Sequence, residues 1–125
     1  MRLWHQDLLA DLPRQQLLGQ HRECCALRGK GWGRPHATVN YVFAHPPAWL
    51  VAYHGLVMDE MVRRGFSPTP TWRDPAYRGA RCAPWRPGEL GQWVPEEAGG
   101  AIYPEHDGRY LQECLENLAV KGVHL

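Results

Sequence analysis

The sequence has no apolar stretch near the ~18 residues that a membrane-spanning helix needs, and its first residues, 1–7, form no apolar signal segment. Its four cysteines form no CxxC pair, and the adjacent Cys24 and Cys25 suit a disulfide framework poorly. These absences argue against a membrane protein and an exported protein. We therefore expect a cytoplasmic protein with reduced thiols.

A general excess of positive charge is also missing, because the formal net charge is only +1. The charge is nevertheless unevenly distributed. Residues 1–88 carry 12 Lys and Arg against 6 Asp and Glu, a balance of +6, whereas residues 89–125 carry 2 against 7, a balance of -5. This asymmetry is compatible with one basic face that meets phosphates, and equally with solubility alone.

Length and apolar periodicity indicate a helical protein with one core. The chain has 125 residues, 44% of them hydrophobic, which is enough for a single domain over residues 1–125. A first helix is predicted over 12–28, with Asp11 as its cap, and a second over 47–64. A last helix precedes Gly122 and has its apolar residues at positions 111, 114, 115 and 118.

Proline and tryptophan are concentrated between residues 67 and 100, where they interrupt helices while the aromatic rings need a surface to pack on. We expect an ordered loop there. Residues 36–43 fit an extended segment or a short helix equally well. The predicted fold class is thus all-α, a single compact domain of three main helices with a long ordered Pro/Trp-rich loop.

The first helix carries polar residues that invite a functional interpretation. Arg14, His21 and Arg28 are spaced seven residues apart and project from the same side as the apolar stripe. They are either buried and hydrogen-bonded within the fold, or they line a cleft that offers guanidinium groups to phosphates. Glu23 lies away from the stripe beside Gly19 and Ala26, which leave room for a ligand to approach its carboxylate.

Short motifs occur in a characteristic order: Leu17 to Glu23 (LLGQHRE), 36–38 (HAT), 61–66 (MVRRGF), 77–79 (YRG) and 102–106 (IYPEH). In this order the chain resembles the pyrimidine-dimer DNA glycosylases, typified by a phage endonuclease V. It is more similar to bacterial relatives of uncertain function than to the phage enzyme. The resemblance covers most of the chain, and its specificity lies in the order of the motifs.

The resemblance implies an all-α DNA-repair glycosylase with an associated AP-lyase activity. In this family the N-terminal amine attacks C1′ of a damaged nucleotide and forms an imine, after which β-elimination cuts the strand. An α-amino group has a pKa near 7.7–8.0, so a useful fraction is unprotonated at neutral pH. Because bulky Arg2 follows Met1, the initiator is expected to be retained, and Met1 would be the nucleophile. Glu23 would stabilise the cationic sugar and move protons.

The resemblance also implies DNA contacts. Arg22 and Arg28 match phosphate-binding arginines of the family, and His21 stands where the phage enzyme has a tyrosine. The complete set of expected DNA-binding residues is Arg22, His21, Arg28, Arg14, Lys30 and Arg78. If the terminus is not the nucleophile, Lys30 in its glycine-rich turn is the fallback. We expect a monomer that acts on DNA without a cofactor or metal. Its substrate is a pyrimidine dimer or another damaged or modified base, since the 80–100 stretch is longer than in the family.

Two other classes of function remain open at this point. Histidine and cysteine residues could bind a metal, with His21, Cys24 or Cys25, His54 and Cys114 as the ligands, although none of the spacings is characteristic of zinc. Alternatively, exposed Trp72, Trp85 and Trp93 could form the surface of a non-catalytic interaction module for a protein or a nucleic acid.

Overall fold

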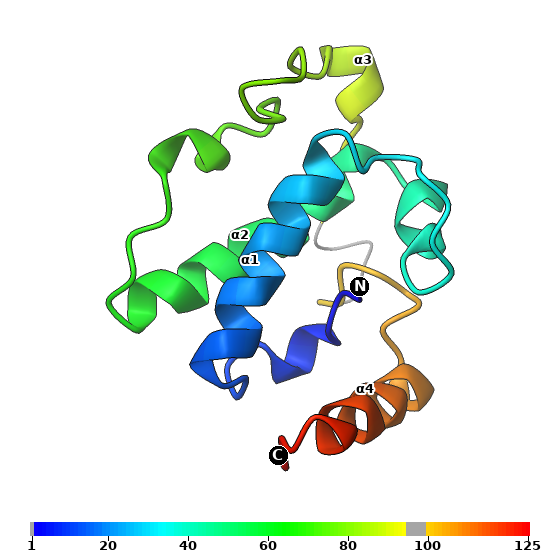
Figure 1. Ribbon diagram of the computed structural model, residues 1–125. Coiled ribbons are helices and arrows are strands. Elements are labelled where there is room, and N and C mark those ends of the chain that lie inside the picture. Colours follow the sequence, from blue (N-terminus) through cyan, green and yellow to red (C-terminus); the bar gives the residue numbers. More distant parts are fainter. Residues whose placement is uncertain (1, 95–99) are drawn as a thin grey trace.

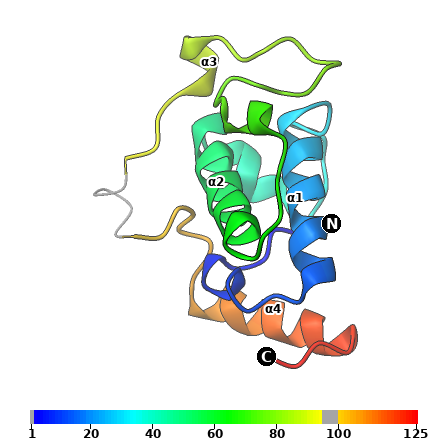
Figure 2. The same cartoon turned by 90° about the vertical axis from the view of Figure 1, so that its left-hand side faces the viewer.

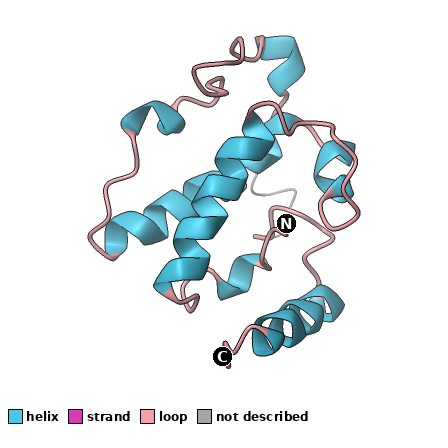
Figure 3. Ribbon diagram, viewed as in Figure 1, coloured by secondary structure: helices cyan, strands magenta, loops and turns pink. Residues whose placement is uncertain are grey.

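The computed structural model describes residues 2–94 and 100–125, and within these ranges it contains helices and no strand (Figure 3). The all-α prediction is therefore confirmed. The helices are α1 (Arg14–Arg28), α2 (Pro47–Arg63), the short α3 (Pro87–Leu90) and α4 (Gly108–Val120), with 3-10 helices at Gln6–Leu8, Asn40–Ala44 and Pro70–Arg73.

The core lies where α1 and α2 pack against each other (Figures 1 and 2). Leu17 and Cys24 of α1 are fully buried, as are Leu50 and Val57 of α2. In Figure 2 helix α4 lies across one end of this pair, and it buries Cys114 and Leu118 against the same core. Each helix thus contributes one apolar stripe to a shared interior.

The start of α1 differs from the prediction. Asp11 is not the cap, because Pro13 occupies the N-cap position and no side chain caps the helix. The chain before it is already folded, since the backbone N–H groups of Asp11 and Leu12 both donate to the carbonyl oxygen of Leu8. Burial of Leu12 fixes this turn and places the first helical residue at Arg14.

The sequence did not decide whether residues 36–43 are extended or helical. In the structure their second half belongs to the 3-10 helix Asn40–Ala44, and Val39 and Val42 are buried. The Pro/Trp-rich loop packs on the helices as expected in its described part. Trp85 is only 5% exposed and meets Trp32 edge-on, with ring centroids 5.6 Å apart. This burial corrects the expectation that Trp85 belongs to an exposed partner surface.

None of the described helices is both long and apolar enough to cross a membrane.

Candidate active site

A cleft of about 420 Å³ opens along one side of α1. It brings together residues from α1, the N-terminal segment, the 36–43 segment and the end of α4. The residues that line it are Arg2, Trp4, Gln15, Gln16, Gly19, Gln20, Arg22, Glu23, Thr38, Asn117 and Lys121. Three of the residues singled out from the sequence, Gly19, Arg22 and Glu23, therefore share one cavity.

Glu23 is the unusual group in this cleft. Its Oε2 atom is buried and has no hydrogen-bond partner among the described residues. A buried carboxylate oxygen without a donor costs free energy, so such atoms mark places where a ligand or a cation binds. Gly19 lies one turn earlier, and a Cβ atom there would come within 3.7 Å of the Arg22 guanidinium.

The N-terminal segment is held against α1 by Gln20. The side chain of this residue accepts a hydrogen bond from the Trp4 backbone N–H at 2.7 Å and donates one to the Arg2 carbonyl oxygen at 3.1 Å. The Tyr53 hydroxyl of α2 lies 2.6 Å from the Trp4 carbonyl oxygen and 3.0 Å from Gln20 Oε1. Residues 2–4 are thus fixed along the cleft. Met1, the predicted nucleophile, lies outside the described residues.

Helix α4 also contacts this N-terminal segment. The Tyr110 hydroxyl donates to the Leu3 carbonyl oxygen, and the Arg2 guanidinium lies 3.3 Å from Glu113. Just beyond the end of α4, Lys121 lines the cleft together with Glu23. Lys30, the predicted fallback nucleophile, lies instead in a second hollow of about 460 Å³.

The predicted phosphate-binding residues fall into two groups. Arg22, Arg14 and Lys30 are exposed, and Arg22 faces the cleft. Arg14 lies over the Phe66 ring at 5.6 Å and is not part of the cleft. Their exposed side chains are available to solvent and to a phosphate.

Arg28 and Arg78 are committed to the fold instead. Arg28 is fully buried, and its guanidinium donates to the carbonyl oxygens of Trp72, Asp74 and Tyr77. Arg78 donates to the carbonyl oxygens of Arg28 and Gly29 at the end of α1. Arg28 therefore ties the loop to α1, and its burial corrects the expectation that it meets a phosphate. The sequence allowed Arg14, His21 and Arg28 either to be buried and hydrogen-bonded within the fold or to line a cleft, and for Arg28 the first interpretation is correct.

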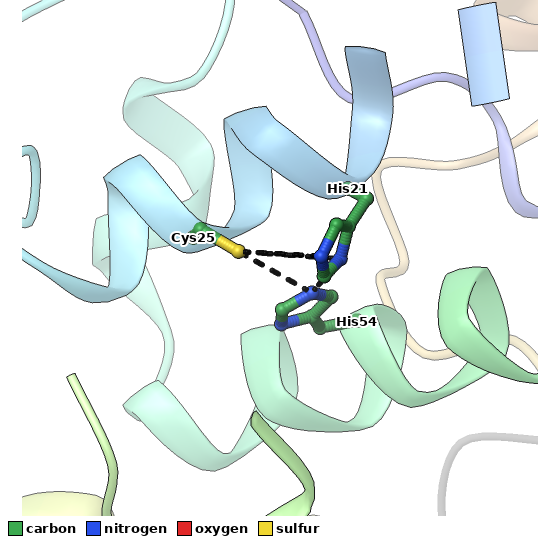
Figure 4. Close-up of side chains that lie close together, drawn as sticks. All are labelled: His21, Cys25 and His54. Carbon is green, nitrogen blue, oxygen red and sulfur yellow. Dashed lines mark hydrogen bonds between the residues drawn. The ribbon is translucent and has the colours of Figure 1, made fainter. Parts of the chain in front are cut away.

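A second polar cluster lies at the interface of α1 and α2, where His21, Cys25 and His54 point toward one another (Figure 4). Nδ1 of His21 is 2.8 Å from Nε2 of His54, and Cys25 Sγ is 3.8 to 4.0 Å from ring nitrogens of both histidines. Burial lowers the pKa of His54 to about 2, with Arg28 adding to the shift, and lowers that of His21. Burial also raises the pKa of the Cys25 thiol to about 11.

The other cysteines that the metal hypothesis considered are elsewhere. Cys24 and Cys114 are fully buried among apolar side chains of the core, and all four cysteines are free in the described structure. Of the residues named in the metal hypothesis, the structure brings His21, Cys25 and His54 together, whereas Cys24 is fully buried in the core.

A family model described as pyrimidine dimer DNA glycosylase matches residues 1–74, more than half of the 125 residues. The chain belongs to this family. The match includes α1, α2 and Glu23, whereas α4 and the part of the Pro/Trp-rich loop after residue 74 lie outside it. No curated protein and no solved structure matches the chain.

Several residues around the cleft of this pyrimidine dimer DNA glycosylase were not identified from the sequence. Gln20 and Tyr53 hold the N-terminal segment from inside the matched region, and Tyr110 and Lys121 approach from outside it. Gln20 left a detectable signal, because it is a polar residue between Leu17 and Cys24 on the buried side of α1. The residues of α4 gave no local signal, since only the tertiary fold brings them to the cleft.

Proposed function

We propose that this glycosylase excises a damaged or modified base from DNA and then cuts the strand. The Met1 amine is the nucleophile, and the Glu23 carboxylate stabilises the cationic sugar and accepts protons. The observation that carries the proposal is the buried, unpartnered Glu23 Oε2 in the same cleft as Arg2, the residue bonded to Met1. A carboxylate in a low-dielectric site stabilises an adjacent cation strongly.

The proposed reaction begins as the amine lone pair bonds to C1′ while the glycosidic bond breaks. The bonding electrons leave with the base, which takes up a proton. Opening of the sugar ring at O4′ gives an imine between the amine and C1′. Removal of a C2′ proton then expels the 3′ phosphate, and hydrolysis of the imine frees the amine. Glu23 stabilises the cationic sugar and accepts protons along this sequence.

Phosphates of the strand are proposed to contact exposed Arg22 at the cleft and Lys30 beyond it, with Arg14 nearer the start of α1. His21 lies half-buried next to Arg22 in the chain. Such contacts position the strand without reading its sequence. The substrate is proposed to be a pyrimidine dimer, as the family description indicates, or another damaged base.

Borohydride trapping tests the proposal directly. Oligonucleotides that carry a pyrimidine dimer, an abasic site or no lesion are incubated with the protein and reductant. We expect a covalent adduct with the dimer and the abasic site and none with the undamaged control. Acetylation of the terminus should abolish the adduct, because it removes the lone pair that forms the imine.

Two pairs of variants assign the chemistry. Glu23→Gln should slow base release by about 100-fold or more, the order of loss when a preorganised group is removed. Exposed Glu116→Gln is the matched control and should match the wild type. Lys121→Arg and Lys30→Arg keep the charge but remove a primary amine that can form an imine. If the acetylated protein still traps and Lys121→Arg does not, Lys121 is the nucleophile and the assignment to Met1 is wrong.

A further inference from the structure

The cluster of His21, Cys25 and His54 has the composition of a transition-metal site. Its ligand atoms lie within 4.8 Å of one another, and two imidazoles with one thiolate suit zinc. Whether it can bind a metal depends on where the proton of His54 lies. A metal at this cluster needs the lone pair of His54 Nε2, the atom that faces the other two side chains.

Arg28 determines that proton position. Its Nη1 atom lies 3.0 Å from His54 Nδ1 and 2.9 Å from the Trp72 carbonyl oxygen, while Nη2 lies 2.7 Å from the Asp74 carbonyl oxygen. A guanidinium only donates hydrogen bonds, so His54 Nδ1 must accept. A neutral imidazole has one N–H group, which in His54 is then on Nε2.

This arrangement argues against a metal. Metal-bound histidines use their second nitrogen to donate to a carbonyl or a carboxylate, whereas the second nitrogen of His54 faces a cation. The carbonyl oxygens nearby are already bonded to Arg28. Binding a divalent ion would place it close to the buried positive charge of Arg28, whose guanidinium donates to carbonyl oxygens.

The proton on His54 Nε2 also determines the tautomer of His21. His54 Nε2–H donates to His21 Nδ1 at 2.8 Å, so the single N–H of neutral His21 is on Nε2. Cys25 Sγ lies 3.8 Å from that nitrogen, and a thiol sulfur is a weak acceptor. The Nε2–H of half-buried His21 therefore remains available to a stronger acceptor.

We propose that His54 is a positioning residue: anchored by Arg28, it holds His21 as a neutral imidazole whose Nε2–H donates to a phosphate oxygen of the bound DNA strand. His21 is half-buried and lies on α1 directly before Arg22, which lines the cleft, whereas His21 is not among the lining residues; a strand bound at Arg22 must extend past the rim of the cleft to reach His21. The proposal rests on the proposed function, because it takes DNA to be the ligand.

The charged and titratable groups around the pair are consistent with its neutral state. His21 faces Arg22 and Arg28 of its own helix together with Cys25, and both cations lower its pKa in addition to burial. His54 faces Arg28, His21 and Arg73, which act in the same direction. Acidification to pH 5.5 should therefore leave the His54 ring uncharged, since its pKa is lowered to about 2.

Nitrogen-15 NMR of the wild-type protein tests the arrangement without DNA. Both rings should show the neutral Nε2–H tautomer at pH 8, and His54 should keep it down to pH 5.5, with signals assigned through His21→Gln and His54→Gln. One equivalent of zinc should leave these signals unchanged. A proton on Nδ1 of His54, or stoichiometric zinc binding that shifts both rings, would overturn the proposal.

Variants test the role toward DNA. Gln in place of His54 keeps an acceptor for Arg28 and a donor for His21, whereas Leu has neither. We expect His54→Leu to weaken oligonucleotide binding at pH 7.5 about fivefold, the loss of roughly one hydrogen bond. His54→Gln should stay within twofold of the wild type, as should the control His124→Gln at an exposed position.

Addition of an undamaged oligonucleotide to wild-type protein should shift the His21 ring signals. If His21 does not respond to DNA, or if His54→Leu binds DNA as the wild type does, His54 does not act through His21. Because the tautomer measurement needs no substrate, it decides the hydrogen-bond arrangement even if trapping fails and the proposed glycosylase mechanism is wrong.

Discussion

Gln20→Ala should separate folding of the N-terminal segment from its role in catalysis. Gln20 is 2% exposed and bonds to Trp4 N–H, the Arg2 carbonyl oxygen and the Tyr53 hydroxyl. Alanine removes these contacts. The Tyr53 hydroxyl retains the Trp4 carbonyl oxygen as its acceptor, but the Trp4 N–H is left without a partner in the interior.

The magnitude follows from these contacts. A buried donor left unsatisfied costs ~1–3 kcal/mol, and loss of the bond to Arg2 costs a further ~0.5–1.5 kcal/mol. Together they lower the free energy of unfolding by about 2–4 kcal/mol, which corresponds to a Tm about 10 °C lower for a domain of this size. Misplacement of a reacting group by ~1 Å can cost about 100-fold in rate, so trapping should slow to that extent.

Borohydride trapping at a temperature at least 10 °C below the Tm of the variant measures the rate, and thermal melting measures the stability. Gln112→Ala on the exposed side of α4 is the matched control and should change neither. If Gln20→Ala melts early but traps at the wild-type rate, the contacts stabilise the fold without positioning the amine, and the reasoning is refuted.

Three further predictions concern charge. Arg22→Ala should reduce the log-log salt slope of DNA binding by about one, whereas Arg63→Ala, which removes a residue paired with Glu60, should leave the slope unchanged, as a filter-binding series would measure. Arg28→Lys should lower the Tm by several degrees in calorimetry, whereas Arg22→Lys should leave the Tm unchanged and weaken the phosphate contact of residue 22. Burial lowers the pKa of His54 to about 2 and of His106 to about 3, so the unfolded chain binds protons that the folded chain does not as pH falls below about 6.5. Urea titrations should therefore show stability declining from pH 6.5 toward 3, by up to about 1.4 kcal/mol per pH unit for each residue, and a flat profile would contradict the neutral assignments.

The sequence predicted the three main helices closely because their signals are local. Apolar spacing and terminal glycine or proline residues located α1 and α2 to within a few residues. The cap at Asp11 was wrong because a turn through buried Leu12 intervenes before α1. Here a tertiary contact outweighed the local preference for an acidic cap.

The site was predictable only where it depends on α1. Glu23 and Arg22 follow from a motif within one helix, and both line the cleft. Lys30 was expected as the fallback nucleophile because it lies in a glycine-rich turn, whereas the fold brings Lys121 into the cleft that Glu23 lines. Burial of Arg28 depends on carbonyl oxygens from residues 72–77, which no pattern within α1 reveals.

The contact of Tyr110 and Glu113 with residues 2–3 has a consequence for biosynthesis. The start of the chain leaves the ribosome first, but the helix that holds it is translated after the rest of the cleft. A nascent chain therefore contains Glu23 before it contains α4, the helix that contacts residues 2–3 next to the proposed nucleophile. Reactivity toward the sugar should arise only once α4 has been released and has docked, so a premature stop before residue 108 would yield a protein that retains the matched family region yet forms no adduct with DNA.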